Sequence, residues 1–183
     1  MVQTRGQRSV FVTVGTTKFE DLIKAVDTPE FAASLAAKGY TQLIIQKGTG
    51  EYVPCKLVPA GSTSAQLASG IKVEYFDFSP SLAEYISSSA LIISHAGSGS
   101  IFETLHAGKP LIVVPNPLLM DNHQAELGDH LAAMQAVVCA APDQLLTAVS
   151  NLDTAKLKPF PAKDACGIID KMDDFMGRHR AAR

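Results

Sequence analysis

Short apolar runs alternate with longer amphipathic stretches along most of this chain, and this alternation is the feature that most limits its fold. The runs have strand length and are rich in Val, Ile and Leu; they span 9–14, 42–46, 71–76, 91–94, 111–114 and 136–139. The stretches between them have helical spacing and span 19–26, 29–37, 80–88, 100–106, 122–134 and 142–152. Parallel strands need crossover connections, which place helices over the sheet. The pattern therefore predicts an α/β fold, a Rossmann-like parallel sheet with helices on both faces.

Local punctuation sets the expected element ends. Ser79 before Pro80 is typical of a capped helix start, which predicts a helix that begins at Pro80. Gly39 and Gly108 fall just after helical patterns, where left-handed helix ends are common. The stretch 47–69 holds Pro, Gly, Ser and Thr without a helical period, so we expect a long loop there with one short strand near 55–58.

Composition excludes several classes of protein. The 183 residues are 46% hydrophobic and 19% charged, which is a globular balance, and the formal net charge of −2 gives no sign of nucleic-acid binding. The apolar runs are far shorter than the roughly 18 residues that a membrane-spanning helix needs, and the polar start lacks a signal-peptide core. We therefore expect a cytoplasmic protein without a membrane span.

Cysteine and histidine spacing gives no indication of a metal centre. The 3 cysteines are widely separated and form no Cys-x-x-Cys pair, so free thiols are expected rather than a disulfide scaffold. No His-Glu-x-x-His pattern is present, and the sequence predicts no metal site.

The last part of the chain differs in charge from what precedes it. Residues 156–183 hold seven Lys or Arg and four Asp or Glu, whereas 73–155 hold one Lys and nine acids. Apolar residues recur at helical spacing over 162–176. We expect a nucleotide-binding domain over 1–155, followed at 156–183 by an amphipathic helix and a basic tail. This helix either contacts a partner or packs on its own domain.

A glycine loop between a strand and a helix is the most informative segment. It comprises Gly97, Ser98, Gly99 and Ser100. Glycines let backbone N–H groups approach an anion, and the start of the helix adds a partial positive charge, so the loop suits a phosphate or diphosphate. No Gly-Lys-Ser/Thr follows, and Phe102 stands where the dinucleotide fingerprint needs its third Gly, so the two common nucleotide motifs do not apply.

Polar groups at other strand ends suit the rest of a nucleotide sugar. Glu103 lies about one helical turn after the loop, where a carboxylate could hold a ribose diol; alternatively it is a first-turn acid that complements the helix dipole. Polar side chains after residue 115 could bond sugar hydroxyls or cap a helix, and a third loop after the first strand could be a ligand loop or a plain turn. The residues concerned are Asn116, Asp121, Asn122, His123 and Gln124 in the first group and Gly15, Thr16 and Thr17 in the second. His95, beside the glycine loop, could contact phosphate or act as an acid or base.

Four stretches together resemble a known family. They are FVTVGTTKFEDLI, LIIQKGTG, VEYFDFSPSLAEYI and SHAGSGSIFETLHAGKPLIVVPNPLLMDNHQAELGDHL. Over about 11–151 the chain resembles the carboxyl-terminal, nucleotide-sugar-binding domain of glycosyltransferase family 28, and within it the eukaryotic branch in which donor and acceptor domains are separate chains. The resemblance implies the donor-binding half of a GT-B glycosyltransferase.

The resemblance also implies a role for individual residues. The glycine loop would hold the diphosphate, Glu103 the ribose, and Asn122 and Gln124 would lie near the donor sugar. Phe78 would lie where the family reads uracil with backbone groups, and further residues would face the diphosphate and the acceptor. These are Thr16, Thr17, Lys47 and Gly48. The implied donor is UDP-N-acetylglucosamine, with no cofactor.

The implied reaction is an inverting β-1,4 transfer of N-acetylglucosamine to dolichyl-diphosphate-N-acetylglucosamine. It needs stabilisation of the leaving UDP and a base, for which His95, Asp121 and His123 are candidates by position. The implied partner is a membrane-anchored, acceptor-binding subunit at the cytosolic face of the endoplasmic reticulum. A non-catalytic UDP-sugar-binding regulatory module and a stand-alone transferase with a soluble acceptor are the alternatives.

Overall fold

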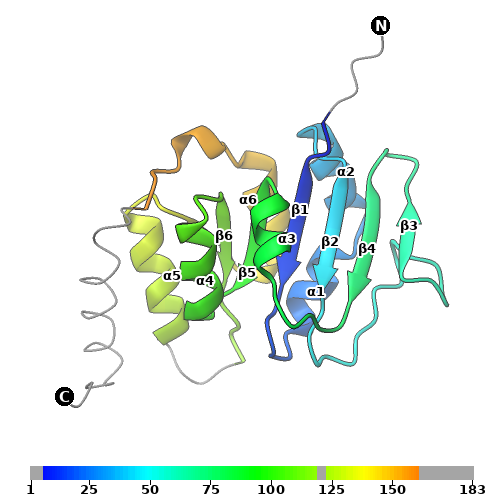
Figure 1. The fold of residues 1–183 in the computed structure, drawn as a ribbon, viewed down its shortest axis with the longest axis horizontal. Coiled ribbons are helices and arrows are strands. Elements are labelled where there is room, and N and C mark those ends of the chain that lie inside the picture. Colours follow the sequence, from blue (N-terminus) through cyan, green and yellow to red (C-terminus); the bar gives the residue numbers. More distant parts are fainter. Residues whose placement is uncertain (1–5, 119–122, 161–183) are drawn as a thin grey trace, which may run out of the picture.

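A mostly parallel sheet forms the centre of the molecule (Figure 1). The computed structural model describes residues 6–118 and 123–160. Within them the sheet has seven strands in the order β3-β4-β2-β1-β5-β6-β7. The strands are β1 (Ser9–Thr13), β2 (Gln42–Gln46), β3 (Ser64–Gln66), β4 (Lys72–Phe76), β5 (Leu91–His95), β6 (Leu111–Val114) and β7 (Val138–Cys139). All neighbouring pairs are parallel except β3 with β4, so the predicted fold class is confirmed.

The strand order reverses beside β1. The chain first builds the sheet outward from β1 through β2 to β4, and then returns to place β5, β6 and β7 on the other side of β1. The loops that follow β1 and β5 therefore diverge to opposite sides. In open parallel sheets, such a reversal creates a crevice at the carboxyl ends of the two strands, where ligands bind.

Helices cover the two faces of the sheet (Figure 1). One face packs against α1 (Glu20–Val26), α2 (Pro29–Ala37) and α6 (Leu145–Asn151). The other packs against α3 (Ala83–Ser88), α4 (Ser98–His106) and α5 (His123–Ala133). Two 3-10 turns, η1 (Pro142–Gln144) and η2 (Thr154–Lys156), flank α6.

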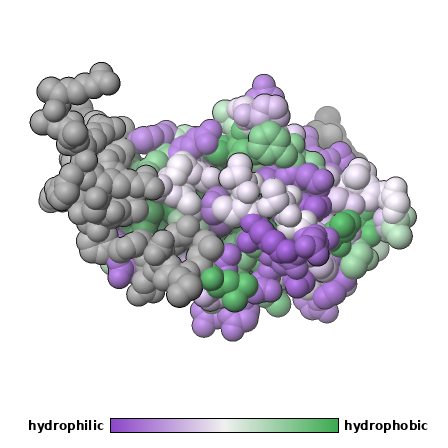
Figure 2. All heavy atoms as spheres, turned by 90° about the horizontal axis from the view of Figure 1, so that it is seen from below, coloured by the Kyte–Doolittle hydropathy of each residue, from purple (hydrophilic) through white to green (hydrophobic). Residues whose placement is uncertain are grey.

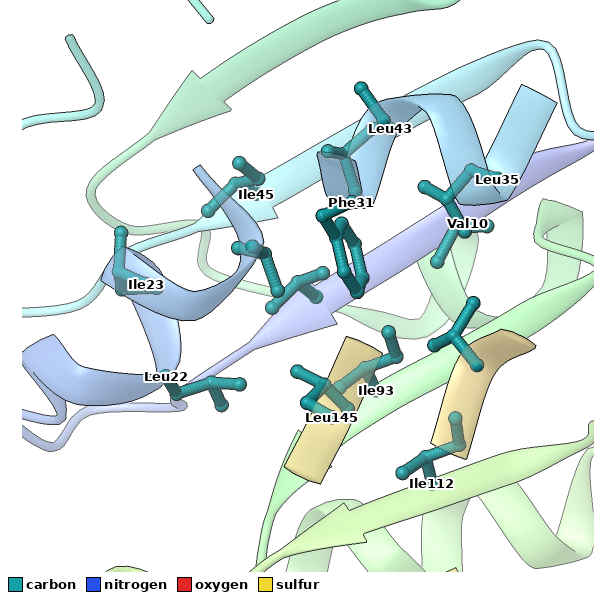
Figure 3. Packing of buried hydrophobic residues seen from close by; sticks show 14 of the residues in the cluster. Val10, Leu22, Ile23, Phe31, Leu35, Leu43, Ile45, Ile93, Ile112 and Leu145 are labelled. Atoms are coloured by element: carbon teal, nitrogen blue, oxygen red, sulfur yellow. The ribbon is translucent and has the colours of Figure 1, made fainter. Parts of the chain in front are cut away.

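Alternate strand residues feed two separate hydrophobic cores. Val10 of β1 packs with Phe31 and Leu35 of α2 (Figure 3). Val12 belongs to the same core, whereas Phe11 between them packs on the opposite face. Successive strand side chains point to opposite sides, and both sides are covered, which explains why the strands are almost uninterrupted apolar runs. The whole of β1 and of β5 is buried, which holds the loops after them on a rigid base.

The left-handed residues predicted at helix ends are confirmed. Gly39 has φ 79° and Gly108 has φ 64°. The strand predicted near 55–58 is wrong. The segment 55–58 is not a strand, because the N–H groups of Cys55, Lys56 and Leu57 bond the Asp27 carboxylate; the short strand of this loop is β3, antiparallel at the sheet edge.

Two helix starts also differ from the predictions. Helix α3 begins at Ala83 rather than Pro80, because Ser79 and Ser81 bond within a preceding turn and the Ser81 hydroxyl accepts from the Ala83 N–H. Helix α4 begins at Ser98 rather than Ser100, so two of the loop residues form its first turn.

Parts of the sequence predictions lie outside the described residues. These are the amphipathic helix at 162–176 and the basic tail. The proposed boundary near 155 stays a prediction; Phe160 packs against the α4 side and the Lys158 N–H donates to the Gln135 carbonyl. Among the described residues, no helix combines the length and the apolar character that crossing a bilayer would require.

Candidate functional site

A cleft of about 560 Å³ opens at the reversal point of the strand order. Its walls come from the loops that follow β1, β4 and β5 and from the first turns of α4. The lining residues are Gly15, Thr16, Gln46, Phe78, Ser79, Pro80, Ser81, Leu82, His95, Gly97, Gly99, Ser100 and Glu103. The parallel strands point downward in Figure 1, so Figure 2, which views the molecule from below, looks onto the edge that carries this cleft.

The start of α4 forms one wall. Gly97 is its N-cap, with φ −74° and ψ 125°, and no described side chain caps the first turn. The first N–H groups of a helix have no partner inside it, and here Gly99 and Ser100 present them beside the cleft. Together with the helix dipole, these groups form a site for an anion such as a diphosphate.

The imidazole of His95 forms the floor between two glycines. A Cβ atom at Gly15 would lie 2.8 Å from Cε1 of the ring, and one at Gly97 would collide with Nε2. His95 is only 7% exposed, and its buried Nδ1 makes no hydrogen bond of good geometry with any described residue. Burial lowers the pKa of His95 and outweighs a raising contribution from the Thr13 backbone. The ring is therefore neutral near pH 7, and Nε2 is its nitrogen nearest to Gly97 at the start of α4, which we call the anion wall.

The loop after β1 forms the opposite wall. Gly15 has φ 61°, a conformation that side chains rarely adopt, and this places its backbone against His95. Thr16 is exposed and lines the cleft. Thr17 does not line it, because its hydroxyl donates to the Val14 carbonyl at 2.7 Å and closes the turn.

The loop after β4 and the second turn of α4 form the rim. Phe78 is 65% exposed at the cleft mouth. Glu103 is exposed and faces the same cleft. Since α4 begins at Ser98, Glu103 lies in the second turn rather than the first, and the effect of the helix dipole falls off within the first turn. The interpretation of Glu103 as a first-turn acid therefore loses its basis.

Lys47 and Gly48 stand behind the cleft rather than in its lining. Lys47 is 8% exposed, and its Nζ lies 3.0 Å from the Gly50 carbonyl and 3.1 Å from Asp77 Oδ1. Gly48 has φ 66° and packs against the Thr17 carbonyl and Val14. Both residues hold loops of the site together in this structure.

The polar group after β6 is described only in part. Asn116 is buried, and its Oδ1 accepts from the Leu118 N–H at 3.0 Å. Asp121 and Asn122 lie outside the described residues, and His123 and Gln124 begin α5 without described side chains. The roles predicted for these four residues, as for every predicted ligand contact, stay predictions.

Sequence reasoning missed Gln46, Ser79 and Ser81 in the cleft lining. Gln46 is the last residue of a buried strand and belongs to no recognisable motif. The sequence could have indicated it only as a polar residue that ends an apolar run, where strand ends face a ligand crevice. In the described ranges 6–118 and 123–160, no group of three or more His, Cys, Asp or Glu could hold a metal ion.

Comparison with known proteins identifies similar chains. A human UDP-N-acetylglucosamine transferase subunit, ALG13, is 45% identical over 124 residues, which is 68% of this chain and 10% of the human protein. The ALG13 of Saccharomyces cerevisiae is 36% identical over 180 residues, covering 85% of this chain and 89% of the yeast protein. The chain thus spans about a tenth of the human relative but most of the yeast one.

Solved structures share the fold. A solution structure of ALG13 determined by NMR superimposes with a TM-score of 0.68 and 30% identity, covering 91% of this chain and 95% of that one. MurG of Acinetobacter baumannii has the same fold with a TM-score of 0.59 and 19% identity; the match covers 85% of this chain and 44% of that one. The model of the glycosyltransferase family 28 C-terminal domain matches residues 9–177. The chain therefore belongs to the glycosyltransferase family 28 C-terminal domain family, together with the ALG13 subunits that it resembles.

Proposed function

We propose that this chain is the donor-binding, catalytic subunit of an N-acetylglucosaminyltransferase that moves N-acetylglucosamine from UDP-N-acetylglucosamine to dolichyl-diphosphate-N-acetylglucosamine. The observation that carries the proposal is the uncapped start of α4, which faces a cleft whose floor is the imidazole of His95. A nucleoside diphosphate supplies the negative charge that the helix start attracts. The family membership and the ALG13 relatives support a transferase of this kind.

The residues of the cleft suit the parts of the donor. The diphosphate would lie against the N–H groups of Gly99 and Ser100, the ribose diol would bond the Glu103 carboxylate, and the uracil would lie beside Phe78. Fixed N–H dipoles stabilise the charge that develops on the leaving UDP, which is what an inverting β-1,4 transfer requires from the donor side. The base for the acceptor hydroxyl comes from His95, Asp121, His123 or the second subunit.

A second protein would complete the active site. The exposed large hydrophobic side chains among the described residues all follow carboxyl ends of strands, in loops or at a helix start. They are Val53, Phe78, Leu118 and Leu146. Figure 2 shows apolar patches on this edge among polar ones. This distribution supports a second subunit that faces the cleft. In the proposal this subunit is membrane-anchored and acceptor-binding, and it recruits this chain to the cytosolic face of the endoplasmic reticulum.

Replacement of Glu103 by Ala tests the donor site. Loss of two carboxylate hydrogen bonds to the ribose should weaken UDP binding in calorimetry by about tenfold or more. Glu30→Ala is the matched control, because Glu30 is an exposed acid in the first turn of α2 and lies outside the cleft lining. Equal UDP affinity in the folded Glu103→Ala variant and the wild type would remove Glu103 from the donor site.

A reconstituted transfer assay tests the reaction and the partner. The purified chain should bind UDP-N-acetylglucosamine but transfer nothing to dolichyl-diphosphate-N-acetylglucosamine until the co-purified membrane subunit is added. Robust transfer to the lipid acceptor by the isolated chain contradicts the partner requirement. No transfer with the partner present favours a regulatory module, and activity of a stable homodimer on a soluble sugar favours a stand-alone transferase.

A further inference from the structure

Gln46 joins the two loops that flank the cleft. It is the last residue of β2, is 1% exposed, and belongs to the cleft lining. Its Nε2 donates to the Gly15 carbonyl at 2.7 Å and to the Asp77 carbonyl at 2.8 Å. Gly15 belongs to the loop after β1 and Asp77 to the loop after β4. One amide group therefore connects two cleft walls that are far apart in sequence.

The two carbonyls determine the orientation of this amide, because a carbonyl oxygen can only accept and must therefore face the amide nitrogen. The amide oxygen then faces Thr13. The Thr13 hydroxyl accepts from the Gly15 N–H at 3.0 Å and donates its own proton to Gln46 Oε1 at 2.6 Å. The amide nitrogen and the amide oxygen of Gln46 thus both have partners, and a buried network whose polar groups all have partners is rigid.

We infer that Gln46 is a positioning residue that sets the spacing between two walls of the donor cleft. One is the loop after β1, which faces the anion-binding start of α4, and the other is the loop after β4, which carries Phe78 and forms the nucleoside wall. Gly15 packs against His95 beside the start of α4, and Asp77 precedes Phe78 at the rim. A ligand that spans both walls needs both in place at once, whereas a ligand that touches one wall does not. This inference rests on the proposed UDP site.

The test compares how much each variant changes the affinity for UDP, which contacts both walls, and for uridine, which contacts one. UDP reaches both walls, and uridine reaches only the nucleoside wall. Gln46→Met keeps the side-chain volume but leaves the two carbonyls without their donor. We expect UDP binding about tenfold weaker, from the loss of the preorganised spacing, with uridine binding within about twofold of the wild type. A merely structural role would move both affinities together.

Gln42→Met is the matched control. Gln42 lies on the same strand and the same side of the sheet, is 6% exposed, and bonds Glu74 and Gln7, but it sits at the opposite end of β2. It should leave UDP and uridine binding unchanged. Thr13→Val, which removes the hydroxyl that donates to the amide oxygen, should reproduce part of the Gln46→Met loss and supplies a second variant if Gln46→Met folds poorly.

The experiment is NMR titration of the labelled full chain with UDP and with uridine, beside thermal unfolding of each variant. If the wild type binds no UDP, the proposed function fails. If the wild type binds UDP and folded Gln46→Met and Thr13→Val bind it equally well, the role of Gln46 is wrong while the proposed function stands. Parallel weakening of UDP and uridine binding would also overturn the positioning role.

Discussion

Replacement of Asp27 tests how much the anchoring of the long loop after β2 contributes to the free energy of unfolding. The residue follows α1, is fully buried, and its carboxylate accepts four hydrogen bonds. Oδ2 accepts from the Tyr52 hydroxyl at 2.7 Å, the Cys55 N–H at 2.8 Å and the Lys56 N–H at 3.1 Å, and Oδ1 accepts from the Leu57 N–H at 3.0 Å. Burial, then the hydrogen bond to Asp27, raises the pKa of Tyr52, so its hydroxyl is the donor at neutral pH.

Replacement of Asp27 by Asn keeps the shape of the side chain and removes one acceptor. In the best orientation, the remaining oxygen keeps the three Oδ2 donors, and the new NH₂ group faces the Leu57 N–H, which loses its partner. One lost charge-assisted bond costs about 2 kcal/mol. Weakening of the three bonds that become neutral costs about 1 kcal/mol more. The free energy of unfolding should therefore fall by about 3 kcal/mol.

Urea unfolding followed by circular dichroism measures this change, and thermal unfolding should show a midpoint lowered by about 6–12 °C. Tyr52→Phe, which removes a single donor, should cost about 1 kcal/mol. Asp21→Asn on the exposed side of the same helix is the control and should change stability by less than about 0.5 kcal/mol. An Asp27→Asn variant within 1 kcal/mol of the wild type would refute the reasoning that this carboxylate holds the loop.

Three further predictions concern the cleft and the thiols. Gly97→Ala should weaken UDP binding measured by calorimetry, because its Cβ would displace the His95 ring; wild-type affinity in the folded variant would contradict this. Burial lowers the pKa of His95, so as the pH falls the unfolded chain takes up this proton before the folded chain does. The contribution of His95 to the free energy of unfolding is therefore fully present above about pH 6.5 and is lost as the pH falls through the folded pKa. Urea unfolding at several pH values should show a shallower loss below pH 6.5 in His95→Gln; an unchanged slope would contradict this. Burial raises the pKa of Cys139 to about 11, so iodoacetamide at pH 8 should label exposed Cys55 well before Cys139 in peptide mapping; equal rates would contradict the assigned burial.

Sequence patterns were sufficient for the central strands of the sheet and for the glycine loop at the start of α4. Continuous Val, Ile and Leu runs occur only where a strand is covered on both faces, so β1, β2, β5 and β6 could be predicted from local composition. The glycine loop was predictable for a similar reason, because a strand, Gly-Ser-Gly-Ser and a helix in succession have a mechanism that depends on adjacent residues alone.

The segment around 55–58 shows what local patterns miss. Its apolar residues predict a strand, but a buried carboxylate 28 residues earlier takes the backbone N–H of Cys55. The start of α3 was missed because the Ser79 hydroxyl donates to the Ser81 carbonyl and the Ser81 hydroxyl accepts from the Ala83 N–H, so a turn precedes the helix. In both places a side chain competes with the backbone for hydrogen bonds, and the competitor is not visible in a periodicity.

The sequence by itself determined the class of fold, the glycine loop and the family, because each depends on residues close together in the chain. Only the tertiary structure decided that the strand order reverses between β1 and β5, and thereby that Gly15 and Gly97 lie on either side of His95. It also decided that Gln46 rather than Lys47 lines the cleft, and that Lys47 is engaged by Asp77. These contacts form between residues of different strands and their loops. The order in which the strands pair decides which side chains meet, and no local sequence pattern contains that order.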